Sequence, residues 1–135
     1  MVVTPLYAGL LGLWLLVLAM RVIHYRSATH IYLGDGGNPS LLRATRGQAN
    51  FVEYVPLALL LFAILEMSRF SIYLLHALGI TLVVARLLHG YAFAFTAEFK
   101  FGRFWGAILT FIVVAIEAVL CIYQSYRGHM VWFAT

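Results

Sequence analysis

The chain has 135 residues, of which 64% are hydrophobic and 10% charged, and its mean hydropathy is +0.94. A soluble domain of this size has no core large enough for so much apolar side chain, so the composition indicates a single domain embedded in a membrane. The net charge is +4, but the basic residues are scattered at the ends of apolar runs. Because nucleic-acid binding needs a basic face, this pattern argues against it. The lone Cys121 excludes an intramolecular disulfide and a CxxC metal site, and we expect an inert, packed thiol.

The first apolar run predicts a membrane helix over about residues 5–24, with Thr4-Pro5 at its start. No basic residue precedes the run and no small-residue cleavage site follows it, so we do not expect a signal peptide. Residues 34–39 give a strong turn signal, and Ser40 is the expected cap of the next helix. His24 and His30 lie in this connection without a carboxylate or thiol nearby, so we expect contact with solvent or headgroups and no metal site.

The second helix is predicted over about residues 41–67, and Pro56 inside it is expected to produce a kink. Its first half carries a polar stripe, because its polar residues recur at spacings of three and four. The stripe consists of Arg43, Arg46, Asn50 and Glu53. Unpaired polar groups are costly in hydrocarbon, so this stripe should face protein, water or a ligand.

The third and fourth helices are predicted over about residues 71–95 and 104–126. The sequence therefore predicts an all-α, four-helix membrane bundle that forms one domain over residues 1–135. Trp132 and Phe133 in the tail are expected at a membrane interface.

Several ionisable residues fall inside the predicted spans. Glu53 and Arg86 each lie roughly 15 Å from one end of adjacent, antiparallel helices at a rise of ~1.5 Å per residue, so we expect them to pair. The pair is either a structural bridge or the floor of a polar pocket. Glu117 is expected to be protonated or bonded to a neighbouring helix or subunit. His76 is expected to be neutral and bonded to a backbone or hydroxyl group, whereas His89 lies on the Arg86 face, nearer a ligand.

Basic residues near the helix ends predict the orientation. They are concentrated in the first and third connections, which by the positive-inside rule face the cytoplasm. These residues are Arg21, Arg26, Arg43, Arg46, Lys100 and Arg103. The polar stripe is then open to a water-soluble ligand.

The side chains around the stripe suit a small zwitterionic ligand with several carboxylates. Arginines bind carboxylates in a bidentate manner, a glutamate holds an amine, and amides and a tyrosine supply further hydrogen bonds. The set comprises Arg43, Arg46, Arg86, Glu53, Gln48, Asn50 and Tyr54. A reaction partner would arrive from the lipid.

At these residues the sequence resembles the MAPEG family (membrane-associated proteins in eicosanoid and glutathione metabolism). R-G-Q-A-N-F-V-E-Y-V-P, residues 46–56, is similar to the family signature R-x-Q-x-N-x-x-E-Y-x-P at every constrained position. A-R-L-L-H-G-Y, residues 85–91, resembles the third-helix segment, and R-F-W-G-A-I-L-T, residues 103–110, resembles the start of the fourth helix. G-D-G-G, residues 34–37, looks like the first loop of short bacterial members. The resemblance covers about residues 5–125.

The resemblance implies a homotrimer in a bacterial inner membrane, with glutathione as co-substrate bound between adjacent subunits near the cytoplasmic side and no metal. Its contacts would be Arg43, Arg46, Gln48, Asn50, Glu53, Tyr54, Arg86 and His89. Arg103 matches the arginine that holds the glutathione thiolate in catalytic members, with Lys100 as the alternative on this short turn. Eicosanoid-producing members have two third-helix tyrosines, where this chain has His89 and Phe93.

Two classes of function follow. The first is a glutathione-dependent membrane enzyme, a transferase that conjugates lipophilic electrophiles or a peroxidase that reduces lipid hydroperoxides, with its second substrate from the bilayer. The second is a non-enzymatic membrane protein of the same trimeric fold that binds another thiol, an amphiphile or a protein partner, and the missing tyrosine favours it. Four short spans without paired broken helices argue against a transporter.

Overall fold

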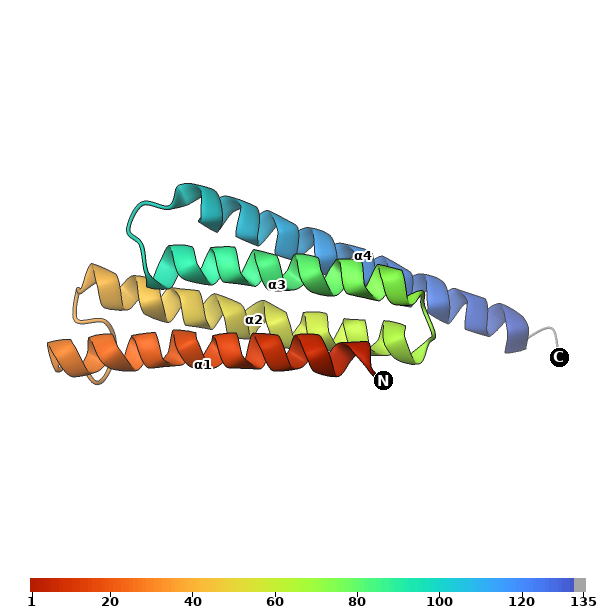
Figure 1. Cartoon of the computed structure of the whole chain (residues 1–135), viewed down its shortest axis with the longest axis horizontal. Coiled ribbons are helices and arrows are strands. Elements are labelled where there is room, and N and C mark those ends of the chain that lie inside the picture. Colours follow the sequence, from red (N-terminus) through yellow and green to blue (C-terminus); the bar gives the residue numbers. More distant parts are fainter. Residues whose placement is uncertain (133–135) are drawn as a thin grey trace.

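The computed structural model describes the backbone of residues 1–132 and the side chains of residues 1–128. Four helices make up this part of the chain, and it contains no strand (Figure 1). They are α1 (Val3–Thr29), α2 (Pro39–Met67), α3 (Ile72–Ala94) and α4 (Lys100–Trp132). The predicted all-α, four-helix architecture is confirmed, while the expected position of Trp132 and Phe133 lies outside the described side chains.

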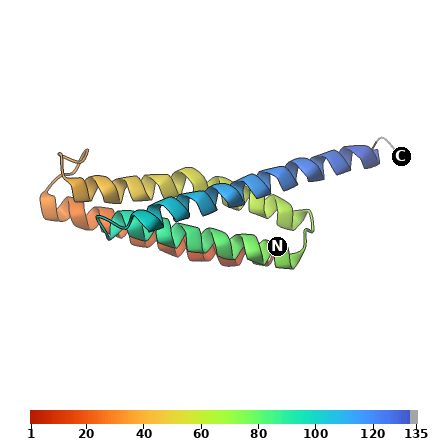
Figure 2. The same ribbon diagram turned by 90° about the horizontal axis from the view of Figure 1, so that it is seen from above.

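The helices run up and down, with α2 and α3 at the centre of the bundle. Each of these two packs against all three other helices, whereas α1 and α4 do not contact one another within the described residues. Figures 1 and 2 show α4 running obliquely across the bundle and past the other helices at the end that carries both termini. We call this the terminal end, and the end with the α1–α2 and α3–α4 connections the loop end.

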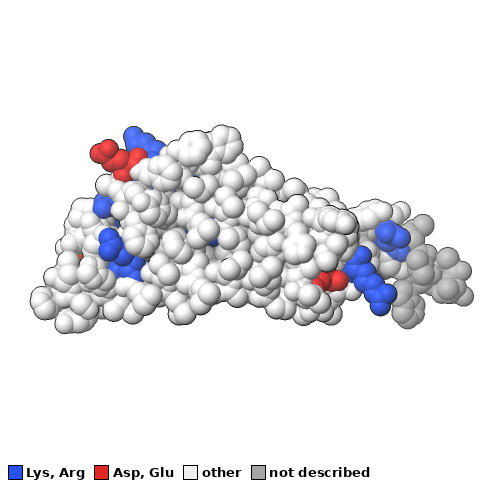
Figure 3. Space-filling view, viewed as in Figure 1, with Lys and Arg blue, Asp and Glu red and all other residues white. Residues whose placement is uncertain are grey.

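All four helices are long and apolar enough to cross a membrane, with α4 contributing residues 100–128. On the face drawn in Figure 3, acidic and basic side chains gather at the two ends of the molecule, and the middle is almost free of them. This distribution suits a bundle whose middle lies in hydrocarbon and whose ends reach the headgroups.

Two helices extend further than predicted from hydropathy. Helix α1 reaches Thr29, so His24 lies well inside the helix and not in the connection. Side-chain hydrogen bonds stabilise the polar last turns of this helix. Arg21 donates to the carbonyl of Ala94 at 3.0 Å and to the Tyr25 hydroxyl at 2.8 Å. Helix α4 begins at Lys100. Hydropathy marks the apolar part of a membrane helix and misses turns that extend into the interface.

The cap of α2 differs from the prediction. Asn38, and not Ser40, is the capping residue, and its Oδ1 accepts from the backbone N–H groups of Ser40 and Leu41 at 2.9 and 3.1 Å. Pro39 then occupies the first turn, where a missing N–H is harmless. The Ser40 hydroxyl instead accepts from Arg43 at 3.1 Å.

Glu66 closes the terminal end of the bundle. Its carboxylate, near the end of α2, accepts from the backbone N–H groups of Val2, Val3 and Thr4 and from the Thr4 hydroxyl. A carboxylate at a helix N-terminus satisfies unpaired N–H groups and the helix dipole together. Glu66 therefore fixes where α1 begins against α2.

Close helix contacts depend on glycines, as is common between membrane helices. A Cβ on Gly106 of α4 would lie 2.7 Å from the Cβ of His89 and 2.8 Å from the carbonyl oxygen of Ala85. A Cβ on Gly47 of α2 would lie 2.8 Å from that of Phe93. These two glycines bring α4 and α2 close to the loop-end half of α3.

We expect Gly106→Ala to destabilise the protein by about 1–3 kcal/mol, because the new methyl group meets α3 backbone that cannot move alone. Gly9→Ala is the matched control, since nothing lies within 4 Å of its Cβ position. In the control, the better helix propensity of alanine should change stability by less than about 1 kcal/mol. Thermal unfolding in detergent measures both, and equal effects would contradict the proposed close contact.

Candidate functional site

The Arg86 guanidinium lies inside the bundle, and the side chain is only 1% exposed. Its Nη2 donates to Asn50 Oδ1 on α2 at 2.8 Å and lies 3.3 Å from His89 Nδ1. Its Nη1 donates to the Thr110 hydroxyl on α4 at 3.3 Å, while Nε has no partner among the described residues. The Phe51 ring centroid lies 5.6 Å from the guanidinium carbon. Buried Arg86 thus joins α2, α3 and α4 through directional contacts.

The predicted Glu53–Arg86 pair is wrong for the single subunit. Glu53 is exposed and forms no hydrogen bond or ion pair with any side chain in the described part of the chain. Asn50, one helical turn earlier, takes the position at Arg86 that was expected for Glu53. The depth estimate placed Glu53 and Arg86 at similar levels, but equal depth does not fix the face on which a side chain lies.

The bond from Arg86 also orients the Asn50 amide. Because a guanidinium only donates, it must meet the amide oxygen, and the Asn50 Nδ2 donors remain free. Asn50 is half-buried, between the interior of the bundle and the outer surface of α2. It can therefore donate to a ligand on that surface while its oxygen is held from inside.

The rest of the polar stripe lies on or near the outer surface of α2. Arg46 is exposed, like Glu53, and forms no hydrogen bond with a described residue. Arg43 is half-buried and bonded only to Ser40. Tyr54 is half-buried, and its ring centroid lies 5.3 Å from that of Phe111 on α4. Gln48 is half-buried and has no hydrogen-bond partner among the described side chains. The stripe therefore runs from the half-buried Asn50 onto the outer surface of α2, and two of its three charged members, Arg46 and Glu53, have no partner among the described residues.

Arg103 is connected to Arg86 by two stacked rings. Its guanidinium carbon lies 4.8 Å from the Phe93 ring centroid, and the Phe93 and His89 centroids are 4.8 Å apart. Arg103 Nη2 donates to the carbonyl of Ala97 at 3.0 Å, while its buried Nε has no partner in the described part of the chain. Lys100 is exposed at the first residue of α4. Arg103, not Lys100, is therefore next to the residues around Arg86.

Two other ionisable residues lie towards the terminal end. Glu117 is completely buried, and neither carboxyl oxygen has a partner among the described residues. A side chain without exposed surface cannot reach a second subunit, and an unpaired buried carboxylate is unfavourable, so the structure favours the expected protonated acid. His76 has the expected hydroxyl partner, because the Tyr7 hydroxyl lies 2.8 Å from its Nδ1. The described side chains contain no cluster of three or more His, Cys, Asp or Glu residues that could hold a metal ion.

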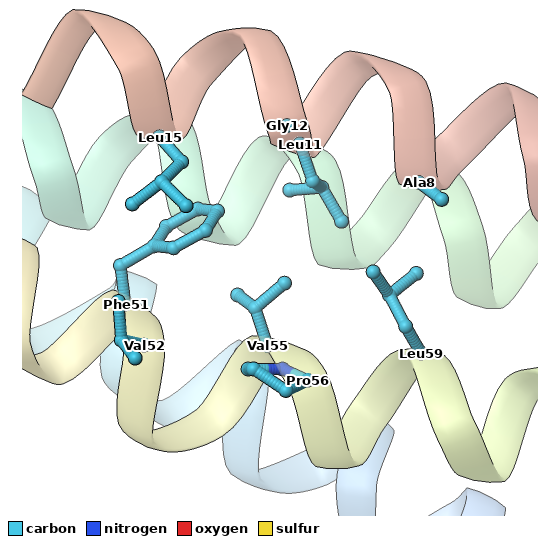
Figure 4. A pocket seen from close by; sticks show the side chains of 9 residues that line it. All are labelled: Ala8, Leu11, Gly12, Leu15, Phe51, Val52, Val55, Pro56 and Leu59. Atoms are coloured by element: carbon cyan, nitrogen blue, oxygen red, sulfur yellow. The ribbon is translucent and has the colours of Figure 1, made fainter.

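A pocket of about 240 Å³ lies on the other side of α2, against α1. Figure 4 shows apolar side chains of both helices facing it. The lining residues are Ala8, Leu11, Gly12, Leu15, Phe51, Val52, Val55, Pro56 and Leu59. This pocket suits an alkyl chain, so it is not the polar pocket predicted from the stripe, which a single subunit does not enclose.

Sequence reasoning gave no role to Thr110 or Phe51, which both contact Arg86. Thr110 ends the fourth-helix motif at residues 103–110, so a signal was present. Its hydroxyl also donates to the carbonyl of Gly106 at 2.7 Å, which fixes its acceptor side for Arg86.

Four apolar spans around a cluster of polar side chains centred on the buried Arg86 define this chain as a multi-pass integral membrane protein of the four-helix type. Its sequence matches the MAPEG family over residues 4–123. It is 37% identical over 91 residues to the inner membrane protein YecN of Escherichia coli K12, a match that covers 67% of this chain and 70% of YecN. YecN of Escherichia coli O6:H1 strain CFT073 matches to the same extent. The chain belongs to the MAPEG family.

We expect Asn50→Ala to destabilise the unliganded protein by about 1–3 kcal/mol, because it leaves a buried guanidinium donor unpaired. Glu53→Gln, one turn away, should change stability by less than about 0.5 kcal/mol, since Glu53 is exposed without a partner. Thermal unfolding in glutathione-free detergent compares the two variants. A larger loss in Glu53→Gln than in Asn50→Ala would show that Glu53, and not Asn50, supports the interior.

Proposed function

We propose that this protein is a glutathione-dependent membrane enzyme that works as a homotrimer. The observation that carries the proposal is the unsatisfied charge of Arg46 and Glu53 on the outer surface of a membrane helix. Such groups are costly against lipid, so another subunit or a polar ligand should cover them. Glutathione bound between adjacent subunits supplies both signs of charge.

The chemistry of the stripe fits that tripeptide. The two carboxylates of glutathione match the guanidinium groups of Arg43 and Arg46, and its amine matches Glu53. Its peptide groups match the free Asn50 amide donors and the Gln48 amide, with the Tyr54 hydroxyl nearby. Arg86 and His89, expected from the resemblance to line the site, support it from inside, because Arg86 holds Asn50 in the donor orientation.

Arg103 is proposed to stabilise the glutathione thiolate. A cation beside a thiol favours the anion, which is the nucleophile in both conjugation and peroxide reduction. The unpaired Nε of Arg103 supports this role over Lys100, which stands exposed at the end of α4. The lipophilic electrophile or lipid hydroperoxide would reach the sulfur from the bilayer.

The proposed orientation places the loop end in the cytoplasm of a bacterial cell. The concentration of basic residues in the first and third connections supports it. The relative YecN is named an inner membrane protein, which supports the same membrane for this chain. Glutathione would then enter from the cytosol at the loop end.

A second candidate is binding without turnover, and the stack of Arg103 on Phe93 favours it. Here the third helix carries His89 and Phe93, and Phe93 offers no hydroxyl to a thiol. Arg103 is engaged by the Phe93 ring and by the Ala97 carbonyl. A protein built this way would hold another thiol, an amphiphile or a protein partner at the same stripe.

Purified protein, glutathione and a generic aryl-halide acceptor test the proposal. We expect a glutathione-dependent rise in the unfolding temperature together with conjugate formation, and S-methylglutathione should bind without reacting. Glu53→Gln should weaken binding by about tenfold, as loss of a charge-assisted hydrogen bond of ~1.4 kcal/mol would. Absence of both turnover and thermal shift would rule the proposal out.

Arg103→Ala should lower turnover by roughly a hundredfold while glutathione still binds, as expected when a stabilising donor is removed from a developing charge. Lys100→Ala is the matched control on the same turn, and we expect its turnover to change by less than about twofold. Binding that survives Arg103→Ala with no activity in either form would select the non-enzymatic candidate. A larger loss in Lys100→Ala would move the thiolate role to that residue.

A further inference from the structure

A polar groove of about 250 Å³ lies at the terminal end. The polar stripe of α2 lies nearer the loop end, so the groove is a separate feature. It is lined by Ser68, which directly follows α2, and by Gln124, Arg127 and Gly128 of α4. The side chains facing it are therefore a hydroxyl, an amide and a guanidinium. All three can donate hydrogen bonds, and none of them is acidic.

Arg127 of this groove and Arg69, which follows Ser68 in the sequence, have no counter-ion among the described residues. Arg127 is exposed, and its guanidinium carbon lies 5.8 Å from the Tyr123 ring centroid. Neither Arg127 nor Arg69 forms an ion pair with a described residue. Glu66, the acidic residue nearest to Arg69 in sequence, is already bonded to the start of α1. Figure 3 shows basic side chains at this end, with an acidic side chain beside them. The positive charge is therefore available to an external anion.

Arg69, which follows the groove residue Ser68 in the sequence, has a backbone conformation that favours glycine. Its φ is 58°, and α2 ends there with Arg69 N–H bonded to the Glu66 carbonyl at 3.0 Å and Phe70 N–H bonded to the Leu65 carbonyl at 3.2 Å. Glycine is the usual residue at this position of a helix end. Part of the compensation is the attraction between a cation and the helix C-terminus. The chain nevertheless places a long, exposed cation next to Ser68 at some conformational cost.

We expect the groove to lie at the level of lipid headgroups. Residues 68–71 connect two membrane-spanning helices, so they mark where the chain leaves the hydrocarbon at this end. Three tyrosines of the neighbouring turns, Tyr73, Tyr123 and Tyr126, are 84%, 51% and 64% exposed. Exposed tyrosines are typical of membrane–water interfaces. Gln124 and Arg127 lie between or beside these tyrosines in the sequence of α4, so we expect them at the level of the phosphates of one leaflet.

We propose that this groove binds the phosphodiester of an anionic phospholipid. The Arg127 fork donates to two phosphate oxygens, Ser68 and Gln124 donate to the phosphate or the ester oxygens, and Arg69 supplies a second positive charge. An anionic lipid is preferred over a zwitterionic one, because the choline or ethanolamine cation would be repelled by two unpaired arginines. The proposal does not depend on glutathione binding.

Native mass spectrometry of delipidated protein, titrated with phosphatidylglycerol or phosphatidylcholine, tests it. We expect one phosphatidylglycerol per subunit to be retained at least about tenfold more tightly than phosphatidylcholine, consistent with one charge-assisted contact. Arg127→Gln should remove that preference. Arg127→Lys should keep only part of it, because the positive charge remains but the bidentate geometry of the guanidinium is lost. Arg127 is exposed, so folding should persist, and Ser68→Ala offers a milder second variant.

Lys100→Gln is the matched control, since it removes one exposed charge from the same helix at the loop end. It should leave the retained lipid unchanged. Equal losses in Lys100→Gln and Arg127→Gln would mean general electrostatic attraction and overturn the site. Inorganic phosphate is the third arm of the titration. If phosphate alone is retained as tightly as phosphatidylglycerol, the assignment to a lipid is also overturned.

Discussion

A guanidinium without a counter-ion or access to water is the constraint around which this bundle is arranged. Arg86 lies in a membrane-spanning helix and must find acceptors inside the protein. It finds them on the two neighbouring helices, at Asn50 and Thr110, and Gly106 lets α4 approach closely enough for the second contact. Apolar packing tolerates small shifts along a helix, whereas hydrogen bonds to a guanidinium do not. Arg86 therefore fixes the register of α2 and α4 against α3, and with it the position of the polar stripe.

Much of the fold could be predicted from the sequence because apolar runs in a membrane protein report helices directly. The helix ends were less accurate, since the last turns of α1 are held by polar contacts such as Arg21 to Ala94, which hydropathy does not register. The prediction of a Glu53–Arg86 pair is wrong for another reason. Sequence spacing gives depth along a helix but not the direction in which the neighbouring helix lies, and Asn50 is on the inner side of the stripe. The contact of Glu66 with the start of α1 joins residues more than sixty positions apart, and local pattern does not reveal it.

The three glutamates of the spans show three ways to place an acid in a membrane bundle. Glu66 lies at an end of the bundle, where backbone N–H groups of α1 receive it. Glu117 lies within the apolar interior without a partner among the described residues, and there an ionised carboxylate has a higher free energy than the neutral acid. Glu53 is neither bonded nor buried, although it lies within a membrane-spanning helix. Within the described chain Glu66 is bonded and Glu117 is enclosed, whereas Glu53 is neither, so we expect the partner of Glu53 to come from outside the subunit.

Helix α2 separates two environments that a glutathione-dependent reaction on a lipophilic substrate would need. On its outer surface it presents Arg46 and Glu53, with Asn50 at the edge of that surface, and against α1 it forms the apolar pocket with Leu11 and Leu15. The apolar surface by itself says nothing about assembly, because every membrane helix exposes such surface to lipid. Unmatched charge is different, since lipid cannot satisfy it and the subunit does not. A second subunit closing over this outer surface of α2 would exclude lipid from Arg46 and Glu53 and leave space only for a polar ligand. The case for assembly thus rests on two charged side chains and not on buried area.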